Sequence, residues 1–322
     1  MTQKQDNTKG ALRKSAERLV KSGQYAEAAE IYGRLAEQHP GDDSFLLAQA
    51  WAHHDNGQRD EAITCFEKLF ARELRRKVFT GFAFDELVRL YRDGRQHDRL
   101  VTICRQAVEV QPDDIPLMRE LGGALLKANM ADEAVEIFEK ITSMEPDAPD
   151  LFCLLGDALI AALRFDSGEA AYQRAIELDP AEAAPFYQRL ANALAETGEF
   201  DRAEAMLNRS LETRADDPLC LIRLAELQVA QQRYEEAKCS TEAAAALNPR
   251  FAASYYNRLG RALADVDRHS DAIEIFDRAI ALEKSNAFFY LYQAESYEKL
   301  GLPERAEESR RKAEKLTPTR RK

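Results

Sequence analysis

Apolar residues recur along this chain at spacings of three and four, in pairs of short stripes separated by a turn. Within residues 115–148, Leu121 and Leu125 belong to one stripe, and Phe138 and Ile141 belong to the next. Positions three and four apart share one face of a helix, so two stripes joined by a turn predict a helix hairpin. No segment alternates as a strand would, and the pattern predicts an all-α chain.

The hairpin pattern returns every 34 residues. Pro112, Pro146 and Pro180 are spaced by 34 and each ends one copy. With short links at 77–80, 183 and 252, the frame extends to nine repeats: 9–42, 43–76, 81–114, 115–148, 149–182, 184–217, 218–251, 253–286 and 287–320. A fixed period predicts a repeat architecture, where the length of 322 residues alone suggests about two compact domains. We therefore expect a single array over 9–320, a flexible N-terminus at 1–8 and a basic tail end at 321–322.

Glycine and proline mark the expected helix ends. All 11 prolines lie at these boundaries, in keeping with a residue that is tolerated in a first helical turn and breaks a helix interior. Five glycines fall in the turns between paired helices, where a left-handed residue ends the first helix. They are Gly23, Gly57, Gly94, Gly198 and Gly301.

Two places in the repeat are reserved for small residues. Eight of nine repeats have Ala or Gly at the eighth place, and eight of nine have Ala or Gly at the twentieth. Small side chains let two helices approach closely, so these places predict where the paired helices pack. The third repeat has Val88 and Leu100 there and follows the insertion at 77–80, which predicts looser packing in that region.

These features resemble the tetratricopeptide repeat (TPR) family, which has a 34-residue helix-turn-helix unit. The resemblance covers 312 of 322 residues and implies a right-handed α-solenoid superhelix of about 18 helices. It also implies that first helices line a concave groove through their fifth, ninth, twelfth and thirteenth places. The polar last helix would then be a capping repeat. The residues that carry the resemblance include Leu121, Gly122, Ala134, Phe138, Pro146, Leu190, Ala191, Leu194, Gly198, Phe200 and Ala203.

The groove places supply the candidate binding residues. They are Trp51, Arg89, Arg92, Arg119, Lys127, Asn192, Asn257 and Arg261. At these places the third and fourth repeats have mostly basic residues and the later repeats mostly acidic ones, which predicts a groove of divided charge. Trp51, the only tryptophan, would be an apolar anchor, and the arginines would bind acidic groups. Each of these roles has an alternative. Trp51 could instead pack between helices, and the arginines could instead pair with Asp85 and Asp93.

No motif in the chain asks for catalysis, a cofactor or a metal. The five histidines are scattered, and the adjacent pair His53-His54 points about 100° apart on a helix, so the two cannot chelate one ion from one face. The pair Gly122-Gly123 lies inside a helix and lacks the spacing of a phosphate loop. The five cysteines show no CxxC spacing and are expected to be small buried hydrophobes. We therefore do not expect an enzyme.

The charge and cysteine content narrow the remaining classes. A formal net charge of −11 argues against nucleic acid as a partner. No run is apolar enough for membrane insertion, and the first twelve residues have no signal-peptide core. An odd cysteine count without a disulfide framework favours a reducing compartment, so we expect a cytoplasmic protein.

The function these observations favour is a non-catalytic adaptor or scaffold that binds an extended peptide or a partner helix in the concave groove. One alternative is a self-assembling structural scaffold, because residues 301–322 carry a net charge of +4 against −15 for the remainder. Another is a regulatory subunit of an enzyme encoded elsewhere. A clamp for the C-terminal carboxylate of a chaperone is not favoured, because no three successive repeats supply its Lys, Asn and Arg set.

Overall fold

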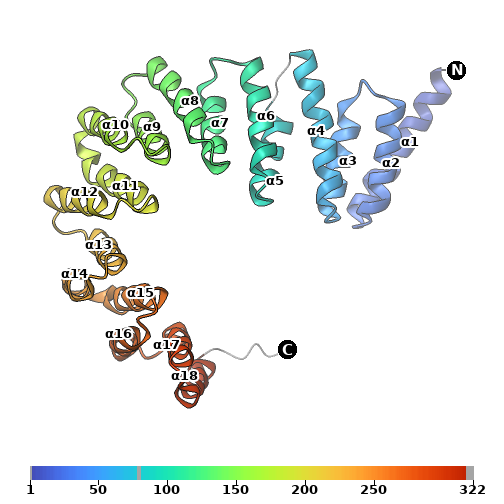
Figure 1. Ribbon diagram of the computed structural model, residues 1–322. Helices are drawn as coiled ribbons and strands as arrows, with labels where there is room; N and C mark the ends of the chain where they lie inside the picture. The colour runs from blue at the N-terminus through green and yellow to red at the C-terminus, as the bar shows by residue number, and fades with distance from the viewer. Residues whose placement is uncertain (1, 78–80, 317–322) are drawn as a thin grey trace. The chain divides into compact units, whose positions relative to one another are not determined.

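The computed structural model describes residues 2–77 and 81–316, which form 18 α-helices, two short 3-10 helices and no strand (Figure 1). The all-α prediction is confirmed, and so is its construction from stacked helix hairpins. The chain divides into two compact units, residues 1–144 and 145–322, and each is described by itself. The prediction that 9–320 forms one continuous right-handed superhelix stays a prediction.

The N-terminal unit contains four hairpins. The first helix begins at Thr2, so the segment that we expected to be a separate N-terminus enters this helix within the described residues. The eight helices are α1 (Thr2–Lys21), α2 (Tyr25–Gln38), α3 (Asp43–Asp55), α4 (Arg59–Arg76), α5 (Phe82–Asp93), α6 (His97–Val110), α7 (Ile115–Lys127) and α8 (Ala131–Met144).

The C-terminal unit contains five hairpins. The residues predicted as one-residue links, 183 and 252, are the first residues of α11 and α15, and each follows a 3-10 turn. The elements are α9 (Pro149–Ala161), α10 (Phe165–Leu178), η1 (Pro180–Glu182), α11 (Ala183–Glu196), α12 (Phe200–Thr213), α13 (Pro218–Ala230), α14 (Tyr234–Leu247), η2 (Pro249–Phe251), α15 (Ala252–Asp265), α16 (His269–Leu282), α17 (Ala287–Lys299) and α18 (Pro303–Leu316).

Every hairpin turns at the fifteenth place of its repeat, where the backbone is left-handed. Only four of these nine residues are glycine, so the conformation belongs to the turn and not to the residue type. Gly94 lies in the turn as expected, but it is not the left-handed residue: its φ is −85°, and the left-handed residue is Arg95, with φ 53°. The nine residues are Gly23, Gly57, Arg95, Asn129, Leu163, Gly198, Gln232, Asp267 and Gly301.

The reserved small places are buried in all nine repeats. Where the eighth place is glycine, an aromatic ring from the second helix takes the space of its missing side chain. A Cβ on Gly260, for example, would lie 2.6 Å from Cε1 of Phe276. The backbones of α5 and α6 approach each other closely at fewer places than the paired helices of any other hairpin, in keeping with the larger side chains of Val88 and Leu100.

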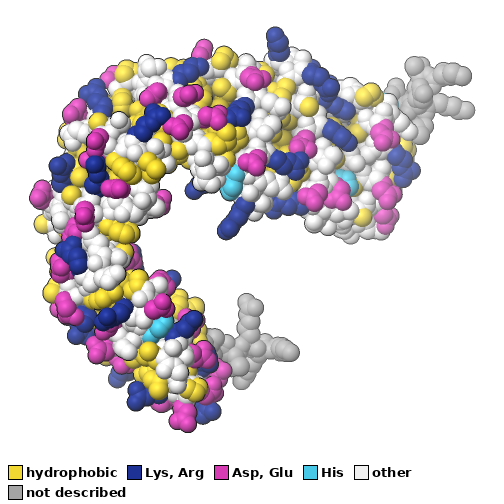
Figure 2. Space-filling model, viewed as in Figure 1, with side chains coloured by type: hydrophobic (Ala, Val, Ile, Leu, Met, Phe, Trp, Pro, Cys, Tyr) yellow, Lys and Arg dark blue, Asp and Glu magenta, His cyan; other side chains and the backbone are white. Residues whose placement is uncertain are grey.

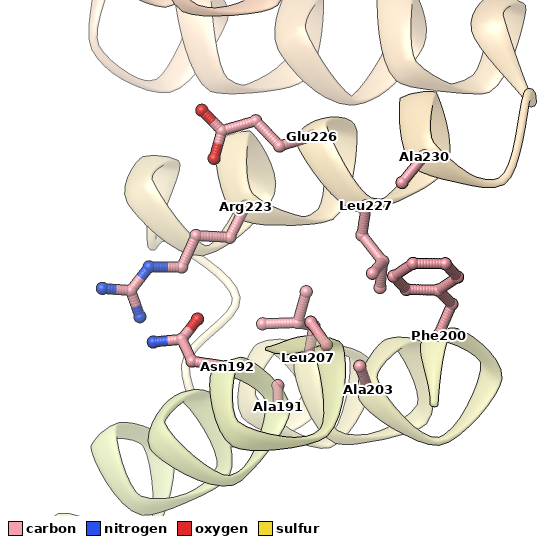
Figure 3. Close-up of a pocket in the computed structure, with 10 residues that line it drawn as sticks. Ala191, Asn192, Phe200, Ala203, Leu207, Arg223, Glu226, Leu227 and Ala230 are labelled. Atoms are coloured by element: carbon pink, nitrogen blue, oxygen red, sulfur yellow. The ribbon is translucent and has the colours of Figure 1, made fainter. Parts of the chain in front are cut away.

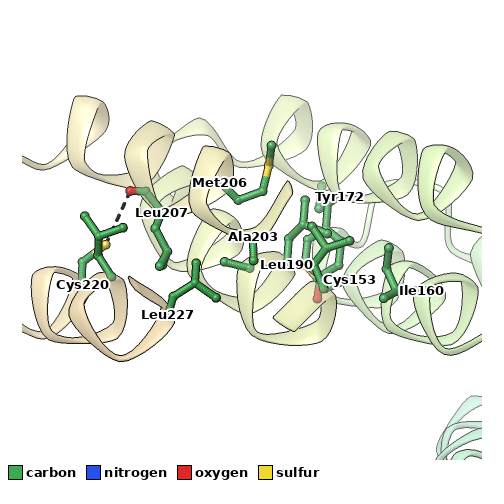
Figure 4. Packing of buried hydrophobic residues seen from close by; sticks show 13 residues of the cluster. Cys153, Ile160, Tyr172, Leu190, Ala203, Met206, Leu207, Cys220 and Leu227 are labelled. Atoms are coloured by element: carbon green, nitrogen blue, oxygen red, sulfur yellow. Dashed lines mark hydrogen bonds between the residues drawn. The ribbon is translucent and has the colours of Figure 1, made fainter. Parts of the chain in front are cut away.

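In the C-terminal unit, one cluster of buried apolar side chains runs through the helices from α9 to α13. Tyr172 of α10, Leu190 of α11 and Leu207 of α12 are buried members of this cluster, which Figure 4 shows. The Cys220 thiol donates to the Leu207 carbonyl oxygen at 3.6 Å. Each hairpin thus buries its apolar stripes against the next one, which is how a repeat too small to enclose a core is stabilised.

A candidate interaction face on the first helices

We define the first-helix face as the side chains at the fifth, sixth, ninth, twelfth and thirteenth places of each repeat. The family resemblance implied the other four places, and the structure shows that the sixth place belongs to the same face. Its side chains form ion pairs and hydrogen bonds with ninth-, twelfth- and fifth-place residues, so they lie on the same face. The sequence signal was present, since arginine stands at the sixth place in three successive repeats, but the family resemblance drew attention to the other places.

In the N-terminal unit, Trp51 is half-buried in an aromatic cluster. Its ring lies edge-on to Phe66 of α4 at 5.7 Å between centroids and to Phe82 of α5 at 6.3 Å. His54, one turn further along α3, lies at 5.3 Å. Trp51 therefore packs between neighbouring hairpins, as one of the two alternatives stated, and only part of its ring is open to a partner.

The two arginines of α5 are engaged by glutamates. Arg89 donates to Glu86 at 2.8 Å and to His54 Nε2 at 3.3 Å, which links it to the Trp51 cluster. Arg92 donates to both carboxylate oxygens of Glu120 on α7, at 2.5 and 2.6 Å. The arginines are thus paired, but the partners are these glutamates and not Asp85 and Asp93. Arg119 and Lys127 are exposed on α7.

In the C-terminal unit, the sixth-place arginines form what we call the arginine ladder: Arg189 on α11, Arg223 on α13 and Arg258 on α15. Arg258 donates through Nε and Nη2 to the two carboxylate oxygens of Glu226, at 2.9 and 2.7 Å. Arg189 donates through Nε to Asp157 at 3.0 Å. In both cases the arginine reaches back to the ninth-place carboxylate of the preceding repeat.

The middle arginine has a different partner. Arg223 donates to Gln188 Oε1 at 3.0 Å. Gln188 is buried, and its amide nitrogen donates to Ser210 Oγ at 3.0 Å and to Asp217 Oδ2 at 2.9 Å. Burial raises the pKa of Asp217, but hydrogen bonds from Cys220 N–H, Gln188 and the Leu219 N–H outweigh it, and the pKa lies below the usual value.

With the sixth place included, the predicted division of charge disappears. Glu86 and Glu120 bring the third and fourth repeats to four acids against four bases. The three arginines of the ladder bring the fifth to ninth repeats to six acids against five bases. On the side of the molecule seen in Figure 2, acidic and basic side chains are likewise intermixed. The face presents pairs of opposite charges in place of one basic and one acidic half.

The remaining candidate residues lie in the C-terminal unit. Arg261 lies over the ring of Tyr292, 5.0 Å from its centroid. Asn257 is half-buried, and its Oδ1 has no hydrogen-bond partner within the described part of the chain. Asn192 is exposed on α11 and borders a pocket. Asn192 therefore lies near the ladder on α11, and Asn257 and Arg261 lie on α15, the helix that also carries Arg258.

A pocket of about 240 Å³ opens between α11 and α13. Phe200, Leu207 and Leu227 form its apolar end, and the side chains of Asn192 and Arg223 lie together at the other side (Figure 3). Ala191, Ala195, Ala203, Ala230 and Glu226 complete the lining. The space exists because small residues stand where a larger side chain would close the gap between the two helices.

Three further features concern metal binding, membrane crossing and the cysteine thiols. Over residues 2–77 and 81–316, no three or more His, Cys, Asp or Glu side chains are placed to hold a metal ion. No helix in the same ranges has the length and apolarity that a bilayer crossing needs. Four cysteines are buried as expected, but Cys239 on α14 is exposed, so that expectation is wrong for this residue.

Family models identify the chain. Two models described as tetratricopeptide repeat match it, one over residues 19–75 and 159–221 and the other over 222–282 and 257–320. Together they cover more than half of the sequence. The protein belongs to the tetratricopeptide repeat family, and the resemblance noted from its sequence is confirmed.

The chain is also similar to three solved structures. A MamA crystal structure is 22% identical over 50% of this chain and 94% of its own, with a TM-score of 0.38. The Cut9 and Hcn1 hetero-tetramer of the APC/C is 14% identical over 97% of this chain and 74% of its own, with a TM-score of 0.40. YrrB, described as a TPR protein with an unusual peptide-binding site, is 19% identical over 58% and 95%, with a TM-score of 0.36. No curated protein matches the sequence.

Proposed function

We propose that this protein is a non-catalytic interaction adaptor that binds an extended peptide segment of a partner protein on its first-helix face. The observation that carries the proposal is the pocket between α11 and α13, which combines an apolar end with a polar side. Such a combination suits peptide binding, because an apolar side chain supplies affinity while polar groups fix the orientation of the chain.

The electrostatics of the face support the same conclusion. Several of its charged groups pair with one another, as Arg92 does with Glu120 and Arg258 with Glu226. A catalytic site would instead aim several groups at one reacting atom. Paired charges on a stack of hairpins provide a rigid polar frame, which is what an adaptor needs to hold a flexible partner at low entropic cost. We propose the cytoplasm as its location, on the free thiols of all five cysteines.

The test is selection of peptides from a random library by the full-length protein and by charge-reversal variants. Arg89→Glu alters the face in the N-terminal unit, and Arg223→Glu alters it in the C-terminal unit, where Arg223 lines the pocket. The matched control is Arg209→Glu on α12, an exposed second-helix arginine outside the face. Binding should fall in at least one face variant and persist in the control.

Two results would overturn the proposal. If the wild type selects no peptide, the protein is not a peptide-binding adaptor. If both face variants bind as the wild type does, peptides bind elsewhere on the molecule. The alternatives of a self-assembling scaffold and of a regulatory subunit stay predictions, and sedimentation at two salt concentrations tests the first of them.

A further inference from the structure

Two of the three arginines of the ladder have the same kind of partner. An arginine at the sixth place of one repeat binds the carboxylate at the ninth place of the repeat before it. Arg189 binds Asp157 in this way, and Arg258 binds Glu226. Hydrogen bonds between a guanidinium and a carboxylate are charge-assisted and strong, so each pair ties two successive first helices together.

The middle pair lacks its carboxylate. The ninth place before Arg223 is Asn192, which has no negative charge. Within the described residues, the side chain of Arg223 makes one hydrogen bond, to Gln188 Oε1, and the side chain of Asn192 makes none. Figure 3 shows the Asn192 amide and the Arg223 guanidinium side by side at the edge of the pocket. A carboxylate supplied from outside would restore the pattern of the other two pairs.

The surroundings hold Arg223 ready for such a ligand. Both donors of the Gln188 amide are taken by Ser210 and Asp217, so its oxygen is directed at the guanidinium. Glu226, the acid one turn further along α13, gives both of its oxygens to Arg258. The guanidinium is therefore positioned by a neutral acceptor and keeps donors available for a second partner.

The apolar end of the pocket adds a second requirement for the ligand. Phe200, Leu207 and Leu227 line it, beside the two polar side chains (Figure 3). A volume of about 240 Å³ accommodates one aliphatic side chain and excludes a folded domain. Burial of that side chain would contribute affinity that a single exposed ion pair does not supply.

We propose that Arg223 and Asn192 bind the side-chain carboxylate of an Asp or Glu in an extended partner peptide, and that the pocket takes a nearby aliphatic side chain of the same peptide. This inference rests on the proposed function and names the chemistry of the partner. An internal side chain is favoured over a C-terminal carboxylate, because the first-helix face continues on both sides of Arg223, over α11 and α15. The neighbouring pairs are also formed by side-chain carboxylates.

The sharpest test is Asn192→Asp. This variant places a carboxylate at the ninth place, as Asp157 and Glu226 do in the flanking repeats, so it should fold and unfold at a higher temperature than the wild type. Its own carboxylate then competes with that of the ligand. Arg223→Gln removes the guanidinium, and Ala230→Leu fills the pocket from an exposed position. Arg189→Gln is the matched control, because it removes a ladder arginine that already has a carboxylate.

The readout is sequencing of peptides selected from a random library with both termini blocked. The wild type should enrich Asp and Glu over Asn and Gln by about tenfold near an aliphatic residue, the effect of one charge-assisted contact. Asn192→Asp and Arg223→Gln should abolish this enrichment, Ala230→Leu should abolish the aliphatic preference, and Arg189→Gln should keep both.

The inference is overturned while the proposed function survives if the wild type selects peptides without an acidic preference, or if Asn192→Asp keeps that preference. Enrichment seen only in a parallel library with free C-terminal carboxylates would also overturn it, since the source of the carboxylate would be the chain end. Failure of the wild type to select any peptide overturns both proposals, and these results are distinguishable from one another.

Discussion

The ring of Phe138 lies against the bare Cα of Gly122. A Cβ on Gly122 would lie 2.8 Å from both Cε1 and Cε2 of that ring, closer than real Cβ atoms approach other heavy atoms. The adjacent Gly123 faces open space, with nothing within 4 Å of an added Cβ. Glycine lowers the stability of a helix interior, and at position 122 it leaves the space that the Phe138 ring of α8 occupies.

This pair gives a prediction with a built-in control. Gly122→Ala should destabilise the protein by about 1–3 kcal/mol. The added methyl group forces the Phe138 ring or the helix to shift, and the free energy of this shift exceeds the gain in helix propensity. Gly123→Ala should stabilise it by up to about 1 kcal/mol, since only propensity changes. Urea unfolding of both variants checks this. Equal shifts of the same sign would show that the ring contact does not constrain the packing.

The left-handed turn residues that are not glycine are sites where the protein can be stabilised. Leu163 has φ 60° and an exposed side chain, so Leu163→Gly should raise the unfolding free energy by about 0.5–1 kcal/mol. The preceding residue, Ala162, has φ −81°, where glycine gains nothing. Thermal unfolding should therefore show Ala162→Gly to be less stable than the wild type, and an increase in that variant would contradict the argument.

The Asp217 carboxylate should make stability depend on acid pH. Its pKa lies below the usual value in the folded protein, so its contribution is complete above a pH of about 4 and is lost as the pH falls through the folded pKa. Asn at this position still caps α13 but does not titrate. Asp217→Asn should lower the unfolding free energy by about 1 kcal/mol at pH 7, and the difference should shrink below pH 4. A difference that stays constant from pH 7 to pH 3 would show that the charge is not involved.

The five thiols should react at very different rates. Burial raises the pKa of Cys104 and of Cys153 to about 12, and Cys65 and Cys220 are also buried with raised pKa values. Cys239 is exposed. One thiol per chain should therefore react quickly with a maleimide under native conditions, and all five should react after denaturation. Cys239→Ser should remove the fast phase, and a fast phase that persists would contradict the burial pattern.

The repeat could be located from sequence because its signals are local. The 34-residue frame, the small residues at the eighth and twentieth places and the proline positions reflect contacts between helices adjacent in the chain. The error at Gly94 is instructive, since the residue type suggested a left-handed turn there. The geometry of the hairpin places that conformation at Arg95, in register with the other eight repeats.

The candidate site could be predicted only in part. Asn192 was identified from its place in the repeat, but Arg223 was not, because its role depends on which side chains of the next first helix come within reach. For the same reason, the predicted basic and acidic halves of the groove are not observed: Glu120 pairs with Arg92, which lies 28 residues away in sequence. Such pairs are set by how successive hairpins stack, and composition at selected places does not reveal them.

The sequence by itself determined the all-helical class, the helix hairpins and the positions of the close helix contacts, because each follows from a short-range pattern that returns every 34 residues. Only the tertiary structure decided which charges are neutralised and which polar group lacks the partner that its equivalents have. Those outcomes depend on distances between side chains of different repeats. They single out the space between Asn192 and Arg223, which lies between two first-helix pairs, Arg189 with Asp157 and Arg258 with Glu226.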